Sequence, residues 1–344
     1  PQVQAGDRSP STKWLCRLVA AKKWGASAQE CAPKGFLREN GTNARDRAYW
    51  LSCKHRITYF PIIVNWNFCR KVRQPMFFYN GVVHPMDGPV ISRGYVSVEG
   101  EKIKAVGPME ALAGLPEGAV DVAGAHILPG LIDAHCHLGV VGSGLGFEAD
   151  ESNEAADPWT PQLRAVDGIN LLDPYFAEAR QAGVTAVITG PGSANPIAGQ
   201  LCAMKTAGRW VDEAVLKAPA AMKFALGENP KTVYNERKES PMTRMATAAL
   251  IREQLSRAVE YRDKQSKADE DPEVEVPDFD AKLEALAQTA GGSLPAHFHA
   301  HRSDDIATAL RLSREFGLKT VIVHGTEGYL IVELLLQAGV PVIT

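Results

Sequence analysis

The sequence predicts a mixed α/β protein, a (β/α)8 TIM-type barrel of about seven strands preceded by a small β domain. Three stretches share one pattern, in which a helix end, a glycine and an all-apolar strand follow one another: Gln181–Gly190, Glu315–Gly325 and Gln337–Thr344. Glycine tolerates the left-handed conformation that ends a helix, and strands that are apolar on both faces suit a parallel sheet. These repeats, with a His-x-His strand end at residues 135–137, favour a barrel over a doubly wound sheet.

The small β domain is predicted from short alternating segments between Phe77 and Ile127. Residues 94–98 and 102–106 alternate in polarity on either side of Glu99-Gly100-Glu101, which is the pattern of a β-hairpin. We therefore divide the chain into an anomalous segment at 1–75, a β domain at 76–130 and a barrel at 131–344 that ends before its last strand.

Residues 1–75 differ in composition from the rest of the chain. They hold fourteen of the 37 Lys and Arg residues, four of the 40 acidic residues and four of the six cysteines, without sustained helix or strand periodicity. We expect Met76 to be the natural start and residues 1–75 to be upstream or misjoined sequence. An organelle transit peptide is the alternative, because the segment is rich in Arg and poor in acid. Its cysteines lack the Cys-x-x-Cys spacing of a zinc module, and its charge comes without a nucleic-acid-binding motif.

The remaining composition is that of a globular protein with a net charge of −3. No apolar run approaches the roughly 20 residues that span a membrane, so we expect neither a membrane nor a nucleic-acid partner. Cys136 and Cys202 read as buried free thiols, which predicts a reducing, cytoplasmic location. The sequence does not decide whether the protein forms a homo-oligomer.

The barrel begins at Leu131–His137, an apolar strand that ends in two histidines. Side chains two residues apart along a strand point to the same face, so His135 and His137 project together and Cys136 points away. Two imidazoles on one face provide half of a site for a divalent metal.

Further histidines follow later strands, where barrel enzymes place their sites. His297, His299 and His301 share one strand face, with His297 deepest, and His324 ends the next strand. For a single histidine the ordinary expectation is a hydrogen-bonded core residue. Three histidines in register beside a His-x-His strand favour a functional site instead.

Lys223 lies inside an otherwise apolar strand, where an unpaired ammonium is costly to bury. It is either a functional group or a lysine whose amine snorkels to the surface at the strand end. Glu228, five residues later, is its rival as a ligand.

The run Pro129-Gly130-Leu131-Ile132-Asp133-Ala134-His135-Cys136-His137 resembles the first barrel strand of the amidohydrolase superfamily, and Met76–Thr344 as a whole resembles its imidazolonepropionase-related members. The resemblance implies a β-sandwich-like small domain and a site for one or two divalent ions, with zinc preferred. It implies that Lys223 is carboxylated by CO₂ and bridges two metals, whereas Glu228 would serve a single-metal site. The metal ligands it implies are His135, His137, Lys223, His299 and His324, and the substrate contacts are His301, Glu228 and Arg302.

The function that the resemblance implies is hydrolysis of a C–N bond in a small amide or cyclic amide by metal-activated water. A deaminase is disfavoured, because Arg302, Ser303 and Asp304 stand where those enzymes carry a glutamate. The catalytic aspartate of the eighth strand is expected beyond Thr344. The alternatives are a non-catalytic dihydropyrimidinase-like relative and an inactive fragment of an amidohydrolase.

Overall fold

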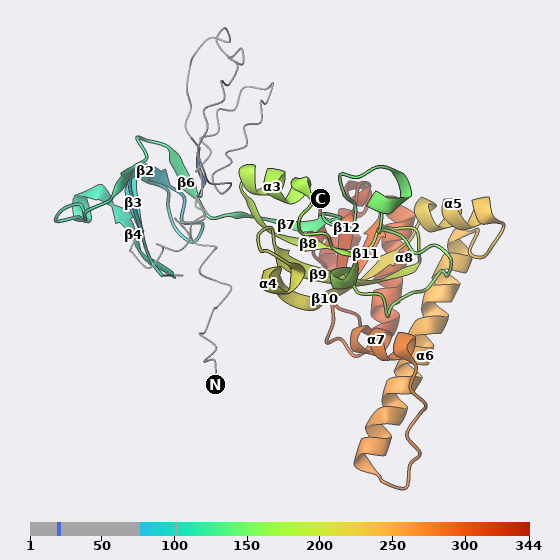
Figure 1. Cartoon of the computed structure of the whole chain (residues 1–344). Coiled ribbons are helices and arrows are strands. Elements are labelled where there is room, and N and C mark those ends of the chain that lie inside the picture. Colours follow the sequence, from blue (N-terminus) through green and yellow to red (C-terminus); the bar gives the residue numbers. More distant parts are fainter. Residues whose placement is uncertain (1–18, 22–75, 101) are drawn as a thin grey trace, which may run out of the picture. The chain divides into compact units, whose positions relative to one another are not determined.

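The computed structural model describes residues 19–21, 76–100 and 102–344 (Figure 1). They form two compact units that divide between Leu131 and Ile132, and the short stretch Gln181–Gly183 groups with the first unit. The expectation for residues 1–75 lies outside the described residues, apart from the strand β1 (Val19–Ala21).

The first unit is built around one six-stranded sheet. Its other strands are β2 (Met76–Val83), β3 (Ile91–Glu99), β4 (Lys102–Pro108), β5 (Val120–Asp121) and β6 (His126–Leu128). The order is β1-β6-β2-β3-β4, with β5 paired to β2. Val96 and Val98 alternate onto the same face and are buried with Ile127. The predicted hairpin is confirmed, since β3 and β4 pair antiparallel from Glu99 and Lys102 onward.

The second unit contains a nearly closed seven-stranded barrel sheet, which confirms the predicted fold class. Its strands are β7 (Leu131–Cys136), β8 (Val184–Thr189), β9 (Ile197–Lys205), β10 (Val215–Ala225), β11 (Ala296–Ala300), β12 (Thr320–His324) and β13 (Val342–Ile343). The order follows the sequence from β7 to β13. Strands β10 to β13 pair in parallel.

Strand β9 departs from the expected alternation of strands and helices, because it runs antiparallel to both β8 and β10. The physical reason lies in its connections. Residues 190–196 and 206–214 join it to its neighbours, and a parallel crossover needs roughly a dozen residues or more. The second connection holds only the short helix α4 (Val211–Ala214).

The helices of the second unit follow the strands and cover the sheet (Figure 1). Besides α4 they are α2 (Ala165–Gly168), α3 (Pro174–Gln181), α5 (Glu228–Arg237), α6 (Arg244–Glu270), α7 (Ala281–Ala290), α8 (Ser303–Phe316) and α9 (Val332–Ala338). Short 3-10 helices lie at Met109–Ala111 in the first unit and at Gly146–Ala149 and Gly328–Ile331 in the second. No helix in the part of the chain that the structure describes is long and apolar enough to cross a membrane.

Helix α8 begins and ends close to the predicted positions. Ile306 and Leu310 are buried on its inner face, and Gly317 ends it in the left-handed conformation with φ 63°. Serine is a residue type that favours the N-cap, but Arg302 stands at the N-cap and Ser303 is the first helical residue. Its backbone nitrogen donates to the carboxylate of Glu327 at 2.9 Å, so an acidic side chain from the next strand connection stabilises the helix start.

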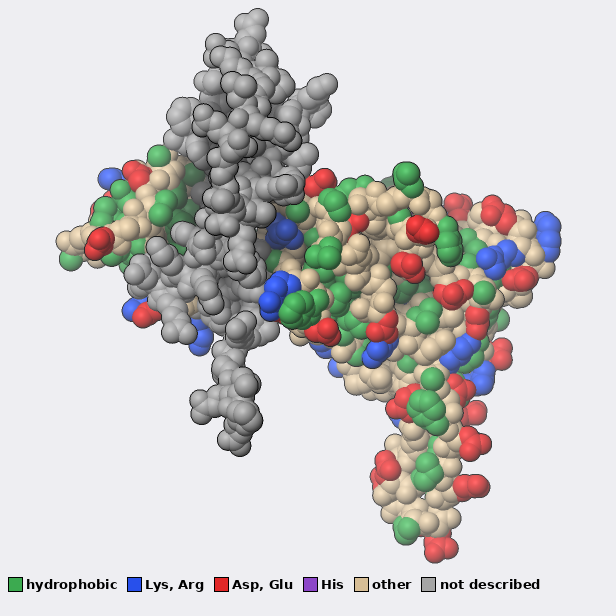
Figure 2. All heavy atoms as spheres, viewed as in Figure 1, with side chains coloured by type: hydrophobic (Ala, Val, Ile, Leu, Met, Phe, Trp, Pro, Cys, Tyr) green, Lys and Arg blue, Asp and Glu red, His purple; other side chains and the backbone are tan. Residues whose placement is uncertain are grey.

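Residues 262–281 are charged and contain two prolines, which predicts a solvated insertion, and this prediction is partly wrong. Helix α6 continues to Glu270, so only residues 271–280 form the loop that leads into α7. The end of α6 projects beyond the barrel and carries many charged side chains (Figures 1 and 2). Its length comes from local signals, since the Thr243 hydroxyl accepts from the Ala246 nitrogen at 3.1 Å and no Gly or Pro interrupts the run.

The main hydrophobic core lies between β10, β11, β12 and the helices α6, α7 and α8. Phe224 and Phe298 are fully buried in it and stack with ring centroids 4.6 Å apart. Burying each such side chain contributes roughly 1.5–3 kcal/mol to folding. This packing fixes the ends of β10 and β11, where the polar residues of the next section lie.

Candidate metal centre

Histidines from three strands and a lysine from a fourth meet at one end of the barrel sheet. The parallel register pairs Lys223 of β10 with His297 of β11, and His299 lies two residues further along β11. In the next pair of strands, His324 of β12 lies beside Ala300. Because the carboxyl ends of parallel strands meet at one edge, residues far apart in sequence are brought together.

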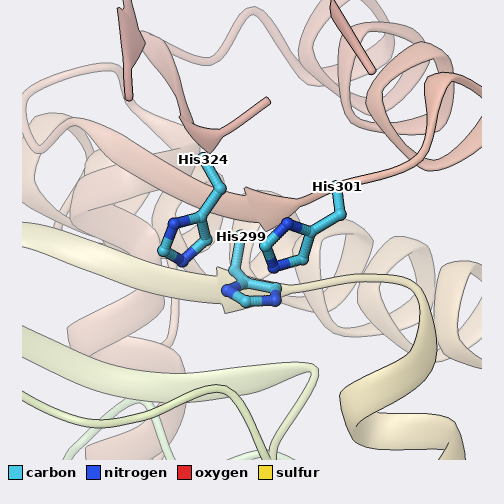
Figure 3. Close-up of side chains that lie close together, drawn as sticks. All are labelled: His299, His301 and His324. Atoms are coloured by element: carbon cyan, nitrogen blue, oxygen red, sulfur yellow. The ribbon is translucent and has the colours of Figure 1, made fainter. Parts of the chain in front are cut away.

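His299, His301 and His324 form a compact cluster (Figure 3). Their potential ligand nitrogens all lie within 4.8 Å of one another, close enough to hold a metal ion. The rings of His301 and His324 stack with centroids 4.6 Å apart, and the ring of His299 lies edge-on to both at 4.7 Å. The sequence predicts His301 as a substrate contact, and the geometry places it directly beside two predicted ligands.

His135 and His137 adjoin this cluster from β7. Their ring centroids are 5.2 Å apart, as their shared strand face predicts, and the ring of His135 lies 5.6 Å from that of His324. Cys136 points away and packs against the hydrophobic cluster around Val140. Burial raises the pKa of the Cys136 thiol to about 11, so it stays protonated at neutral pH.

Lys223 is fully buried, which is contrary to the alternative of a lysine that snorkels to the surface. Its Nζ lies 3.2 Å from Nε2 of His135. Burial lowers the pKa of Lys223 to about 7, because the low-dielectric interior disfavours the ammonium form. A large part of this amine is therefore uncharged near neutral pH and carries a free lone pair.

Burial also keeps the histidines neutral. It lowers the pKa of His135 and of His299 to about 2, and the charge of Lys223 is the second cause in both cases. The pKa values of His137 and His324 are lowered too, again chiefly by burial. Neutral imidazole is the form that binds metals, so the environment favours the ligating state.

The backbone at His324 adopts the left-handed conformation, with φ 71°, and Gly325 follows with φ 57°. A side chain in this region is strained, and such strain concentrates at functional sites. Gly325 is required here, since a Cβ would lie 2.9 Å from Cγ1 of Val342 on β13. The turn directs the His324 ring back toward His299.

Two buried imidazole nitrogens in the described part have no hydrogen-bond partner, namely Nδ1 of His135 and Nδ1 of His297. An unsatisfied buried polar atom is costly, and an ion that it can bind is one way to satisfy it. The orphaned His135 nitrogen, the three-histidine cluster and the desolvated Lys223 fit a divalent metal centre with nitrogen ligands. His297 is 5 % exposed and lies beside Lys223, in the deep position that the sequence predicts.

The other predicted substrate contacts lie outside the ring cluster. Arg302 forms an ion pair with Asp304 at 2.8 Å and is half-exposed. Glu228 is exposed in the first turn of α5. Neither is a member of the histidine group that could hold an ion.

Several contacts to the histidines were not predicted from the sequence. The Gly190 carbonyl lies 2.8 Å from Nδ1 of His137, and the Ser193 hydroxyl lies 2.9 Å from Nδ1 of His299. The Asn229 amide nitrogen lies 3.3 Å from Nε2 of His299, and the Thr326 hydroxyl lies 2.7 Å from Nδ1 of His301. The positions of these residues in the sequence could have indicated the contacts, because each residue follows a barrel strand or a site histidine.

Comparison with known proteins identifies the family. A solved amidohydrolase from Thermotoga maritima MSB8 is 40 % identical, with a TM-score of 0.74, over 78 % of this chain and 69 % of that one. The chain therefore belongs to the amidohydrolase superfamily, which confirms the resemblance seen in the sequence. The placement near imidazolonepropionase stays a prediction.

A second relative is a curated protein, amidohydrolase tasK of Hapsidospora irregularis. It is 32 % identical over an alignment of 264 residues that covers 70 % of this chain. The chain spans 27 % of the length of that protein. No family model matches the sequence.

Proposed function

We propose that this protein is a metal-dependent hydrolase that cleaves a C–N bond in a small amide or cyclic amide. The observation that carries the proposal is the cluster of His299, His301 and His324 beside a fully buried Lys223, in a chain of the amidohydrolase superfamily. Barrel enzymes place their reacting groups at this end of the sheet.

The proposed metal ligands are four histidines and one lysine at or near the ends of the barrel strands. Divalent ions bound there, one or two and preferably zinc, would supply Lewis acidity toward the amide carbonyl and a water of lowered pKa. The ligands are His135, His137, Lys223, His299 and His324.

Lys223 is proposed to act as its carbamate. Its uncharged amine attacks the carbon of CO₂, a C–N bond forms as one C–O π bond opens, and the nitrogen gives up a proton to solvent. Burial supports this step, since it lowers the pKa of Lys223 to about 7 and makes the uncharged amine available. The resulting anion would offer two oxygen ligands, and pairing with the bound cations would offset the cost of burying its charge.

His301 is proposed to contact the substrate rather than to complete the metal site. It is exposed, unlike the buried His299, so a substrate can reach it. Glu228 and Arg302 flank the same strand ends and are proposed to contact the more distant parts of a substrate. The proposed compartment is reducing and cytoplasmic, which suits the free thiols of Cys136 and Cys202.

A non-catalytic dihydropyrimidinase-like role is the rival proposal. The retained histidines argue against it, because a scaffold protein has no need for strained and desolvated imidazoles such as His324. An inactive amidohydrolase fragment is the other alternative, and it predicts bound metal without turnover.

The test combines metal analysis with a hydrolysis assay. The chain, stripped with a chelator and reloaded with zinc, is assayed against five- and six-membered cyclic amides and short dipeptides. We expect hydrolysis that requires metal and is lost in His299→Gln. The matched control is His126→Gln in β6 of the small sheet, where Nδ1 of the histidine lies 2.7 Å from Nε2 of His84. Hydrolysis that persists in His299→Gln or in excess chelator would refute the proposal.

A further inference from the structure

The connection between β8 and β9, residues 190–196, is an unusual loop because it is buried. All of its residues except Pro191 are buried, and Asn195 is 2 % exposed. Loops normally lie on the surface, since a buried loop must satisfy its backbone polar groups internally. This loop lies against the histidines of the metal centre, and it contacts two of them.

Its first contact fixes one imidazole tautomer. The carbonyl oxygen of Gly190 lies 2.8 Å from Nδ1 of His137. A carbonyl only accepts hydrogen bonds, so Nδ1 of His137 must carry the hydrogen. In the neutral ring this leaves the lone pair on Nε2, the nitrogen available to a metal.

Its second contact holds the ring of His299, whose tautomer follows from a third residue, Asn229. Ser193 Oγ lies 2.9 Å from Nδ1 of His299, and the Asn229 amide nitrogen lies 3.3 Å from Nε2 of the same ring. An amide nitrogen only donates, so Nε2 of His299 carries the lone pair. Nδ1 therefore carries the hydrogen and donates it to the Ser193 hydroxyl.

The loop itself is held from both sides. The Gly192 nitrogen donates to the Ser152 carbonyl at 2.7 Å, and the Tyr234 hydroxyl donates to Oδ1 of Asn195 at 2.7 Å. A Cβ at Gly192 would lie 2.6 Å from the amide of Asn153, so the loop packs against its neighbour without room for a side chain. Ser193 and Gly190 are thus presented by a rigid support.

We infer that the loop Gly190–Pro196 sets the ring orientation of two histidines at once, through the Gly190 carbonyl and the Ser193 hydroxyl, and that together with Asn229 it keeps both rings in the Nδ1–H tautomer. Ser193 is a positioning residue, since it acts on a metal through His299 and touches no substrate. A fixed second partner of a ligating histidine typically changes metal affinity by about 10–100-fold. The effect on affinity rests on the proposed metal site, whereas the tautomers are a property of the metal-free chain.

The first test is therefore made without metal. Histidine labelled with ¹⁵N is incorporated into the chelator-treated chain, and the ring nitrogens are read by NMR near neutral pH. Loss of signals in His137→Gln and His299→Gln assigns them. We expect both rings to carry hydrogen on Nδ1. A wild-type His299 ring protonated on Nε2 would overturn the inference, whether or not the protein binds metal.

The second test measures what the hydroxyl contributes. In Ser193→Ala the Nδ1–H of His299 loses its acceptor, so the ¹⁵N signal of that nitrogen should shift, and zinc affinity measured by chelator competition should fall about 10–100-fold. The matched control is Ser313→Ala, which removes a hydroxyl that donates to the Leu318 carbonyl at 3.2 Å and lies on α8. It should leave tautomers and affinity unchanged.

The outcomes separate the inference from the proposed function. Unchanged zinc affinity and an unchanged Nδ1 signal of His299 in a folded Ser193→Ala would refute the role of Ser193. A wild-type chain that holds both Nδ1–H tautomers but binds no zinc would refute the proposed metal site and leave the role of the loop standing. If Ser193→Ala does not fold, the wild-type tautomers decide.

Discussion

The Nζ atom of Lys223 lies 3.2 Å from Nε2 of His135, although 88 residues separate them and they belong to strands at different places in the barrel sheet. The contact spans the interior of the barrel, since β9 and β8 lie between β10 and β7 in the sheet order. It makes Lys223 part of the histidine site rather than of the hydrophobic core. The first two predictions concern this lysine.

Removing the lysine should reduce metal binding. We expect Lys223→Ala to hold fewer ions than the roughly two of a binuclear site, because the bridging anion is lost. Short carboxylic acids added to the variant should restore part of the activity by replacing that anion. Metal content is measured by elemental analysis, with Glu228→Ala as the control. Full metal content in Lys223→Ala together with loss in Glu228→Ala would reassign the centre to a single-metal site.

The same lysine should make the stability of the metal-free chain depend on pH. Its pKa is lowered from 10.5 to about 7 on folding, so the unfolded state binds more protons between these values. Stability therefore rises with pH across this window and is lost as pH falls through it. Lys223→Met should remove that rise, which urea unfolding at several pH values measures. An equal slope in the variant and the wild type would contradict the prediction.

His301 and His324 should differ in what they bind, although their rings stack. We expect His324→Gln to lower metal content. In His301→Gln the metal should remain and KM should rise about tenfold, the magnitude expected for one lost hydrogen bond to substrate. Metal content and KM are measured on the same preparations. Loss of metal in His301→Gln would make His301 a ligand.

The ion pair between Arg244 and Asp305 should be important for stability. Asp305 is 4 % exposed and Nε of Arg244 lies 2.9 Å from it, so Arg244→Met leaves a buried carboxylate without its partner. We expect a loss of about 3–5 kcal/mol in the free energy of unfolding. The control is Arg252→Met, whose pair with Glu315 is partly exposed on both sides and should contribute about 0–1 kcal/mol. Equal losses in urea unfolding would contradict this difference.

Local periodicity predicted the parts of the site that lie within one strand. His135 and His137 share a face because a strand repeats every two residues, and the same rule grouped His297, His299 and His301. The depth of Lys223 was predictable from the apolar residues around it. These predictions needed no knowledge of which strands are neighbours.

What the sequence did not predict depends on contacts between distant residues. Ser193 and His299 are 106 positions apart, and nothing local to either indicates the hydrogen bond between them. Helix α6 was missed for a different reason. Its exposed end is charged on all sides, so apolar periodicity fails there, and the helix persists through propensity. The antiparallel direction of β9 could have been predicted from its short connections, which leave no room for a parallel crossover.

The turn at His324 and Gly325 limits how this sequence can change. Few side chains are acceptable at two successive residues in the left-handed conformation. At Gly325, Val342 lies too close to leave room for any side chain. The position of a proposed ligand thus depends on a neighbour that binds nothing. A library that randomises Gly325 and selects for zinc retention should return glycine almost alone, whereas one that randomises the exposed Lys238, also left-handed at φ 63°, should tolerate asparagine and glycine.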